Sequence, residues 1–287
     1  MSSNLNASAA GERALGPDLT VHRLGFGAMR ITGPGVWGEP PEVATAVRVL
    51  QRAVRLGVNF IDTADSYGPE VSESLIARAL APYPRDLVIA TKGGLVRPGP
   101  EVWNRDGRPE HLRRACESSL KRLRIERIDL YQLHAPDPNV PLEESLGELV
   151  RLQGEGKIRH LGLSNVSVDE LERAERLTPI VSVQNRYNLE DRHCDAVLAY
   201  CESRDIAFLP WAPLGSGRHA AGGRGTGALE RVARRHGITR GQAALAWLLG
   251  RSRVMLPIPG TGSMEHLDEN VAAASVRLTP EDMRELG

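Results

Sequence analysis

The sequence lacks the features that mark several large classes of protein. No run of about 18 apolar residues occurs, so no transmembrane helix and no membrane partner are expected. The 36 basic and 36 acidic side chains cancel, and nothing in the charge pattern favours a nucleic-acid partner. Residues 1–18 are polar and lack the apolar core of a secretory signal. We therefore predict that they form a mobile lead-in and that the protein is cytoplasmic.

Cysteine is also scarce, and its spacing argues against a metal site. Cys116, Cys194 and Cys201 are far apart and stand in no C-x-x-C pair. No histidine or cysteine lies at ligand spacing from another, so we expect reduced, structural thiols and no bound metal.

Lysine is rarer than the charge count suggests. The 36 basic residues comprise 33 arginines and three lysines, Lys92, Lys121 and Lys157. Lysine is a compact charge whose pKa shifts readily on burial, whereas arginine stays charged and presents a wide fork. Lys121 and Lys157 stand in polar surroundings, so Lys92 is the lysine for which a chemical role is expected.

Short apolar runs alternate with helical segments along the whole chain, and their order predicts one architecture. Eight runs begin at Leu24, Val58, Leu87, Ile128, His160, Ile180, Ile206 and Val254. Continuous apolar strands that alternate with helices predict a parallel sheet covered on both faces. Eight such units predict a single-domain TIM (β/α)8 barrel over residues 19–287. A long loop is expected over residues 215–227, and the oligomeric state is left open.

Most of these runs end in a polar or aromatic residue. The terminal residues are Asp62, Lys92, His134, Ser164 with Asn165, Gln184 and Trp211. In a TIM barrel, the active site lies at the C-terminal face of the strands, so these side chains should surround one opening. Tyr67 follows Asp62 within the stretch "IDTADSYG" and should reach the same opening.

Four of these residues form a set that can deliver a proton to an oxygen gaining negative charge. A phenol with a pKa of about 10 is a weak acid at neutral pH unless a cation stabilises its anion. Lys92 can supply that cation next to Tyr67, Asp62 can hold Lys92, and His134 can bond the substrate oxygen. A carbonyl that receives a hydride develops such an oxygen, and because no side chain supplies hydride, a nicotinamide cofactor is expected.

At this point the sequence resembles the aldo-keto reductases over nearly its whole length. The motifs are "IDTADSYG", "ATKGG", "YQLHAP", "GLSN", "VQNRYN", "WAPLG" and "IPGTGSMEHLDEN". The resemblance implies that Asp62, Tyr67, Lys92 and His134 are the catalytic tetrad, with Tyr67 as the acid. The stretches "GFGAMRITGPGVWGEP" and "VQNRYN" are similar to those of bacterial pyridoxal reductase-like members, which makes pyridoxal a candidate carbonyl substrate.

The resemblance also implies a set of cofactor contacts. Ser164, Asn165 and Gln184 would bond the nicotinamide carboxamide, and Trp211, where many members have tyrosine, would stack on its ring. Leu214 and Gly215 would meet the pyrophosphate, and Ser263, Glu269 and Asn270 the adenosine end. NADPH is the cofactor implied. NADH stays open because Gly260 and His266 stand where many members place a lysine and an arginine.

Two alternatives and one tryptophan remain open at the level of sequence. A Schiff-base aldolase could use Lys92 as its nucleophile, although Asp62 and Tyr67 stand where they would hold its charge. A regulatory subunit could bind the nucleotide without turnover. Trp37, in the loop over residues 30–41, could wall the substrate pocket or anchor the loop.

Overall fold

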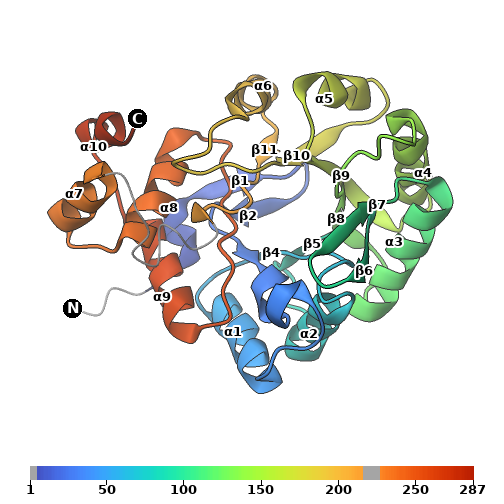
Figure 1. The fold of residues 1–287 in the computed structure, drawn as a ribbon, viewed down its shortest axis with the longest axis horizontal. Helices are drawn as coiled ribbons and strands as arrows, with labels where there is room; N and C mark the ends of the chain where they lie inside the picture. Colours follow the sequence, from blue (N-terminus) through green and yellow to red (C-terminus); the bar gives the residue numbers. More distant parts are fainter. Residues whose placement is uncertain (1–4, 216–226) are drawn as a thin grey trace.

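A computed structural model describes residues 5–215 and 227–287 of the chain. Its centre is a curled parallel sheet in the order β11-β10-β9-β8-β5-β4-β3 (Figure 1). The bounds are β3 Phe26–Gly27, β4 Phe60–Asp62, β5 Val88–Gly93, β8 Ile128–Leu133, β9 Ile158–Ser164, β10 Ile180–Gln184 and β11 Ala207–Phe208. The predicted loop over residues 215–227 falls mainly on residues 216–226, which lie outside the described part.

The eighth predicted run closes the barrel, although two prolines prevent a continuous ladder. On one side, Phe208 N donates to Val254 O at 2.8 Å and Leu256 N donates to Phe208 O at 2.9 Å. On the other side, Gly25 N donates to the carbonyl of Pro257 at 3.0 Å. Pro257 and Pro259 have no N–H, so residues 254–259 can only accept at those positions. The predicted TIM barrel is confirmed.

Helices follow the strands and surround the sheet, as the alternation predicts (Figure 1). Their bounds are α1 Val43–Arg55, α2 Val71–Leu80, α3 Pro109–Leu123, α4 Leu142–Gly154, α5 Val168–Glu175, α6 Asp195–Arg204, α7 Gly227–His236, α8 Arg240–Arg251, α9 Met264–Ala272 and α10 Pro280–Leu286. Four short 3-10 helices are also described: η1 Ala7–Ala10, η2 Ala28–Ile31, η3 Pro34–Val36 and η5 Ala273–Ser275. None of the described helices is long and apolar enough to cross a membrane.

The predicted mobile lead-in over residues 1–18 does not fit the part of it that the structure describes. Residues 5–18 contain η1 and the strand β1 (Glu12–Ala14), which pairs antiparallel with β2 (Thr20–His22). Leu15 is completely buried and packs with Leu19 and Val21 against inward-facing strand residues such as Phe60. A few apolar residues in a polar stretch are therefore enough to hold this hairpin against the barrel. Residues 1–4 lie outside the described part.

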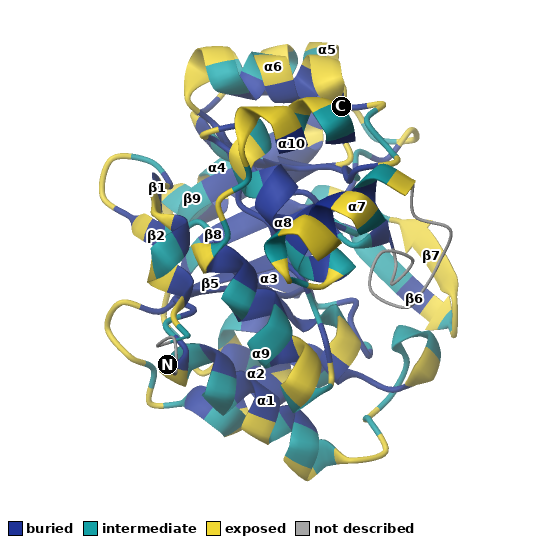
Figure 2. Ribbon diagram, turned by 90° about the vertical axis from the view of Figure 1, so that its left-hand side faces the viewer, coloured by how far each residue is buried: buried dark blue, intermediate teal, exposed yellow. Residues whose placement is uncertain are grey.

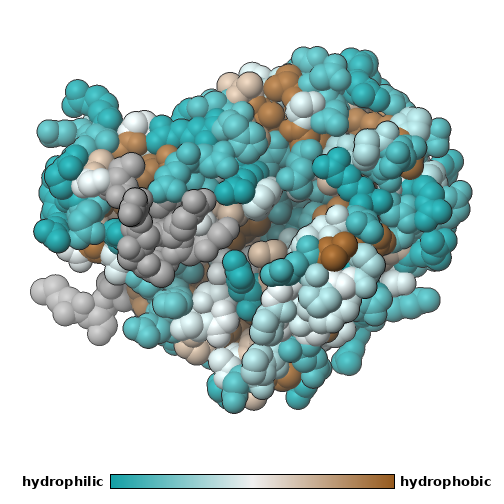
Figure 3. All heavy atoms as spheres, viewed as in Figure 1, coloured by the Kyte–Doolittle hydropathy of each residue, from teal (hydrophilic) through white to brown (hydrophobic). Residues whose placement is uncertain are grey.

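A second hairpin was not predicted. Strands β6 (Leu95–Gly99) and β7 (Val102–Arg105) pair antiparallel between β5 and α3. Figure 2 shows that β7 is exposed, whereas the barrel strands and the inward faces of the helices are buried. The face viewed in Figure 3 is mostly hydrophilic and is hollowed near its centre.

Candidate active site

Asp62, Lys92 and Tyr67 meet at the C-terminal ends of two neighbouring strands. Strands β4 and β5 pair in parallel with Asp62 opposite Ala90, so Lys92 lies two residues further along. Lys92 Nζ donates to Asp62 Oδ2 at 2.7 Å and to Thr63 O at 2.8 Å. The same ammonium lies 3.4 Å from the Tyr67 hydroxyl. The structure therefore brings together the three residues that the sequence grouped, with Lys92 completely buried.

The electrostatics of this group keep the ammonium charged and the phenol protonated. Burial alone would lower the pKa of Lys92, but Asp62 and Tyr67 act against it and the pKa of Lys92 is raised. Burial raises the pKa of Tyr67, and Lys92 is the largest effect opposing that rise. Lys92 thus moves the pKa of the phenol in the expected direction but does not bring it below its ordinary value.

The second oxygen of Asp62 is held by two amides. Gln132 Nε2 donates to Asp62 Oδ1 at 3.1 Å, and Gln184 Nε2 donates to the same oxygen at 2.7 Å. Gln132 was missed by the sequence reasoning. A polar residue two positions before His134, inside an apolar strand, was the available signal, because alternate residues share a face. The Gln184 amide nitrogen is committed to Asp62, so its carbonyl oxygen is the atom that can meet a carboxamide.

His134 is buried and lies edge-on to Tyr67, with ring centroids 5.8 Å apart. Its Nδ1 lies 3.3 Å from Ser66 Oγ, a second contact that sequence reasoning missed. Burial and then the nearby Lys92 charge hold the pKa of His134 well below its usual value. The imidazole is therefore neutral at neutral pH. When Ser66 donates to Nδ1, the ring proton is on Nε2, where it can be offered to a substrate oxygen.

Ser164, Asn165 and Trp211 form a hydrogen-bonded group next to His134. Asn165 has a left-handed backbone (φ 59°) and its Nδ2 donates to His134 O at 3.0 Å and to Ser164 Oγ at 3.1 Å. Its Oδ1 accepts from Trp211 Nε1 at 3.0 Å. The Arg186 guanidinium lies 5.5 Å from the centroid of the Trp211 ring. Asn165 thus holds the Trp211 indole at a fixed position relative to His134.

The remaining predicted cofactor residues lie on two other segments. Leu214 and Gly215 end the described stretch after β11, and Gly215 has φ 57°. Ser263 caps α9, its side chain accepting from His266 N at 3.3 Å. Glu269 and Asn270 lie in the last turn of α9, with Asn270 buried. The start of α9 reaches the strand-end face, since a Cβ on Gly262 would lie 3.3 Å from the carbonyl of Arg30 in η2.

Gly260 has a structural reason to be glycine. A Cβ at that position would lie 2.3 Å from Gly27 O, so a side chain could not be accommodated where residues 254–259 meet β3. His266 is exposed near the start of α9. Backbone packing therefore accounts for a glycine, in place of the lysine of many family members, at position 260. It gives no reason for the histidine at position 266.

The β6–β7 hairpin places two further residues at the site. The Trp103 ring lies edge-on to Tyr67 and His134, at centroid distances of 6.3 Å and 6.4 Å. The Arg97 guanidinium lies 3.6 Å from the Trp103 ring centroid. Trp37 also approaches the site, because it forms an isolated β-bridge with Gly68. Sequence reasoning missed the hairpin because its strands carry no apolar alternation.

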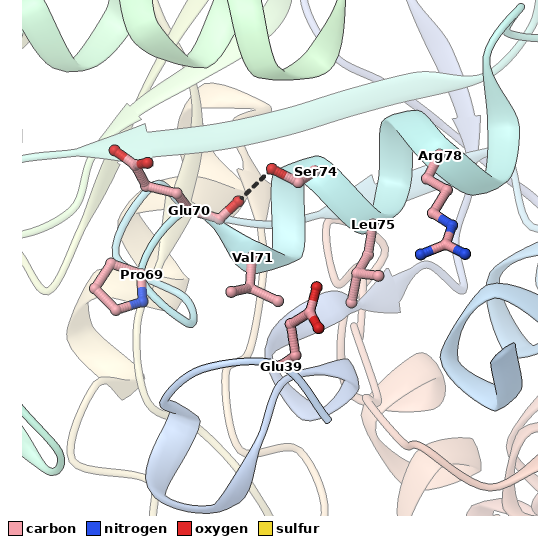
Figure 4. Close-up of a pocket in the computed structure, with 7 residues that line it drawn as sticks. All are labelled: Glu39, Pro69, Glu70, Val71, Ser74, Leu75 and Arg78. Atoms are coloured by element: carbon pink, nitrogen blue, oxygen red, sulfur yellow. Dashed lines mark hydrogen bonds between the residues drawn. The ribbon is translucent and has the colours of Figure 1, made fainter. Parts of the chain in front are cut away.

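A separate hollow lies alongside α2 and is lined by none of these residues. Its volume is about 290 Å³, and Figure 4 shows the side chains that line it. They are Glu39, Pro69, Glu70, Val71, Ser74, Leu75 and Arg78. None of the predicted site residues lines it, so it contributes nothing to the chemistry described above.

The barrel and its strand-end group define a class of oxidoreductase. The Aldo/keto reductase family model matches residues 23–287, and the chain therefore belongs to the aldo/keto reductase family. The resemblance drawn from the motifs is thus confirmed.

Two curated relatives and one solved structure are similar over most of their length. An uncharacterized oxidoreductase of Schizosaccharomyces pombe is 50% identical, covering 98% of this chain and 90% of the relative. Pyridoxine 4-dehydrogenase of Escherichia coli is 40% identical, covering 91% and 92%. An aldo/keto reductase from Klebsiella pneumoniae, solved with NADP and acetate, has a TM-score of 0.81 at 27% identity, covering 96% and 93%.

Proposed function

We propose that this protein reduces an aldehyde or ketone to the alcohol with NADPH, and that pyridoxal is among its substrates. The observation that carries the proposal is the buried Asp62–Lys92–Tyr67 chain beside the buried His134 ring. Similarity to pyridoxine 4-dehydrogenase and to a reductase that binds NADP supports the substrate and the cofactor. When bound, NADPH supplies the hydride to the carbonyl carbon.

Each residue of the tetrad has one task in this proposal. Tyr67 gives its hydroxyl proton to the carbonyl oxygen as negative charge develops there. Lys92 stabilises the resulting phenolate, and Asp62 holds Lys92 in place and keeps its charge in a dry site. His134 donates a hydrogen bond to the same oxygen and orients the carbonyl.

The predicted cofactor residues fit a nicotinamide nucleotide. The Trp211 indole offers a flat face, while Ser164, Asn165 and the Gln184 carbonyl oxygen offer polar atoms for a carboxamide. The start of α9, with Ser263, suits a phosphate because the first backbone N–H groups of a helix have no partner within the helix and point outward from its end. Leu214, Gly215, Glu269 and Asn270 complete the proposed set. The proposal favours NADPH over NADH. Gly260 and His266 stand where many family members place a lysine and an arginine for the 2′-phosphate of NADPH, so these two positions do not support that preference.

The contacts of Lys92 disfavour the Schiff-base alternative. A nucleophilic lysine must lose its proton, but Asp62, Thr63 and Tyr67 all stabilise the ammonium. The pKa of Lys92 is accordingly raised rather than lowered. The aldolase proposal would need a covalent adduct on Lys92 after borohydride treatment with substrate.

The proposed location is the cytoplasm. The three cysteines are free and buried, and burial raises the pKa of Cys116 and of Cys201 to about 12. Thiols of this kind suit a reducing compartment.

Steady-state oxidation of NADPH with a panel of aldehydes, pyridoxal included, tests the proposed function. Turnover with at least one aldehyde is expected, and NADH should be used less efficiently. Tight NADPH binding with no turnover on any aldehyde would instead support the regulatory-subunit alternative.

A further inference from the structure

Arg97 joins three loops at the mouth of the site through backbone carbonyls. Its Nε donates to Val102 O at 2.9 Å, across the β6–β7 hairpin. Its two terminal nitrogens donate to Val36 O at 3.1 Å, Gly35 O at 3.0 Å and Ser66 O at 3.4 Å. Ser66 immediately precedes Tyr67. A single side chain therefore links the hairpin, the loop after β3 and the loop that carries the proposed acid.

The same guanidinium fixes the position of an indole. It lies 3.6 Å from the Trp103 ring centroid and 5.7 Å from that of Trp37. Trp103 is 37% exposed, yet its ring stands edge-on to both Tyr67 and His134. An aromatic ring that is open to solvent on one side and contacts the reacting residues on the other forms a wall of the substrate mouth.

Arg97 is poorly placed to bind a substrate anion. Only 8% of its surface is exposed, and burial lowers the pKa of its guanidinium. Among the described residues, its hydrogen bonds run to four carbonyls, and no salt bridge to a carboxylate accompanies them. The fork geometry of a guanidinium suits several carbonyls and a stacked ring at once, which an ammonium could not match.

We propose that Arg97 is a positioning residue that clamps Trp103 over the mouth, and that the site thereby favours carbonyl substrates that carry a flat ring. The inference rests on the proposed function. A planar aromatic or heteroaromatic aldehyde can lie against the indole while its carbonyl reaches Tyr67. A short aliphatic aldehyde makes little contact with Trp103, so its reduction depends on the tetrad and cofactor alone.

The test compares pyridoxal and benzaldehyde with propanal as substrates. In Trp103→Ala, KM for the two ring-bearing aldehydes should rise about five- to tenfold, while kcat and the KM for propanal stay within about twofold. Arg97→Met should reproduce that split in KM, and Arg97→Lys should not restore it. Because Arg97→Met also releases the Ser66 carbonyl beside Tyr67, any fall in kcat should be the same for all three aldehydes. In KM for the ring-bearing aldehydes, the double variant should be no worse than either single variant, because both changes remove one contact unit.

Val102→Ala is the matched control on the same hairpin. It keeps the carbonyl that Arg97 uses, and its side chain projects to the face of β7 opposite Trp103, so wild-type kinetics are expected. Chymotryptic cleavage after Trp103 measures the clamp without turnover. Arg97→Met should be cut about tenfold faster than wild type, while NADPH affinity and thermal unfolding show that the barrel is intact.

Three results would overturn the inference. They are equal KM changes for ring-bearing and aliphatic aldehydes, additive effects in the double variant, and an unchanged cleavage rate in Arg97→Met. A wild-type protein that reduces no aldehyde would contradict the proposed function instead, and the cleavage experiment would still report on the clamp.

Discussion

Replacing Tyr67 with phenylalanine removes one hydroxyl group and separates catalysis from folding. Among the described residues, that hydroxyl accepts a hydrogen bond from Lys92 Nζ at 3.4 Å, a long distance for such a bond. Its loss should therefore lower the free energy of unfolding by less than about 1 kcal/mol. Turnover should fall by about 10² to 10⁴, the usual effect of losing a general acid, which corresponds to about 3 to 5 kcal/mol in the barrier.

The assay is kcat/KM for pyridoxal or benzaldehyde, followed by NADPH absorbance, beside NADPH affinity and denaturant unfolding. Tyr83→Phe is the matched control. It also loses a phenol oxygen, one that donates to Leu123 O at 2.7 Å far from the tetrad. The control should be destabilised by about 1 kcal/mol and keep its activity. Near-native turnover of Tyr67→Phe with normal NADPH binding would refute the assignment and leave His134 or water as the proton donor.

Three further outcomes are expected. Lys92→Met leaves the Asp62 carboxylate buried without its cation. It should abolish turnover and lower the free energy of unfolding, measured with denaturant, by about 3 to 5 kcal/mol. A variant as stable as the wild type would contradict the buried ion pair. Trp211→Ala should weaken NADPH binding at least several-fold and remove the fluorescence quenching on binding, whereas an unchanged Kd would exclude stacking. Asp282→Asn at the start of α10 should lower stability at pH 7 by about 1 to 3 kcal/mol, because this buried carboxylate accepts from Thr279 and its pKa is depressed. Since stability from a depressed carboxyl pKa is present above the ordinary value of 3.8 and lost below it, the difference from wild type should shrink in acid.

The barrel could be predicted because its signal is local and repeated. Each apolar run is followed by a helix-forming segment, and parallel order follows from that alternation. The hairpin at β6 and β7 gave no such signal. Its strands include Pro98 and Gly99, the four residues of β7 are all exposed to solvent in part, and the order of the hairpin depends on Arg97 reaching carbonyls of distant loops. Contacts of that kind cannot be read from periodicity.

The lead-in illustrates the same limit at the other end of the barrel. Leu15, Leu19 and Val21 stabilise the hairpin only by packing against strand residues of the folded barrel. Composition alone predicts disorder for such a segment, because it contains few apolar residues and their packing partners lie far away in the sequence. Those partners come together only when the barrel strands have formed the closed sheet.

The tetrad could be predicted for a different reason, which the scarcity of lysine makes visible. Lys121 is exposed, and Lys157 bonds Glu117 and Glu155 at 2.7 Å each near the surface, where arginine could serve equally well. Lys92 alone is completely buried, with its ammonium among a carboxylate, a carbonyl and a phenol. A guanidinium is too wide to occupy that space and cannot direct one compact charge at all three oxygens. In a chain that otherwise uses arginine, Lys92 is therefore the position at which we propose that chemistry, rather than surface charge, determines the residue.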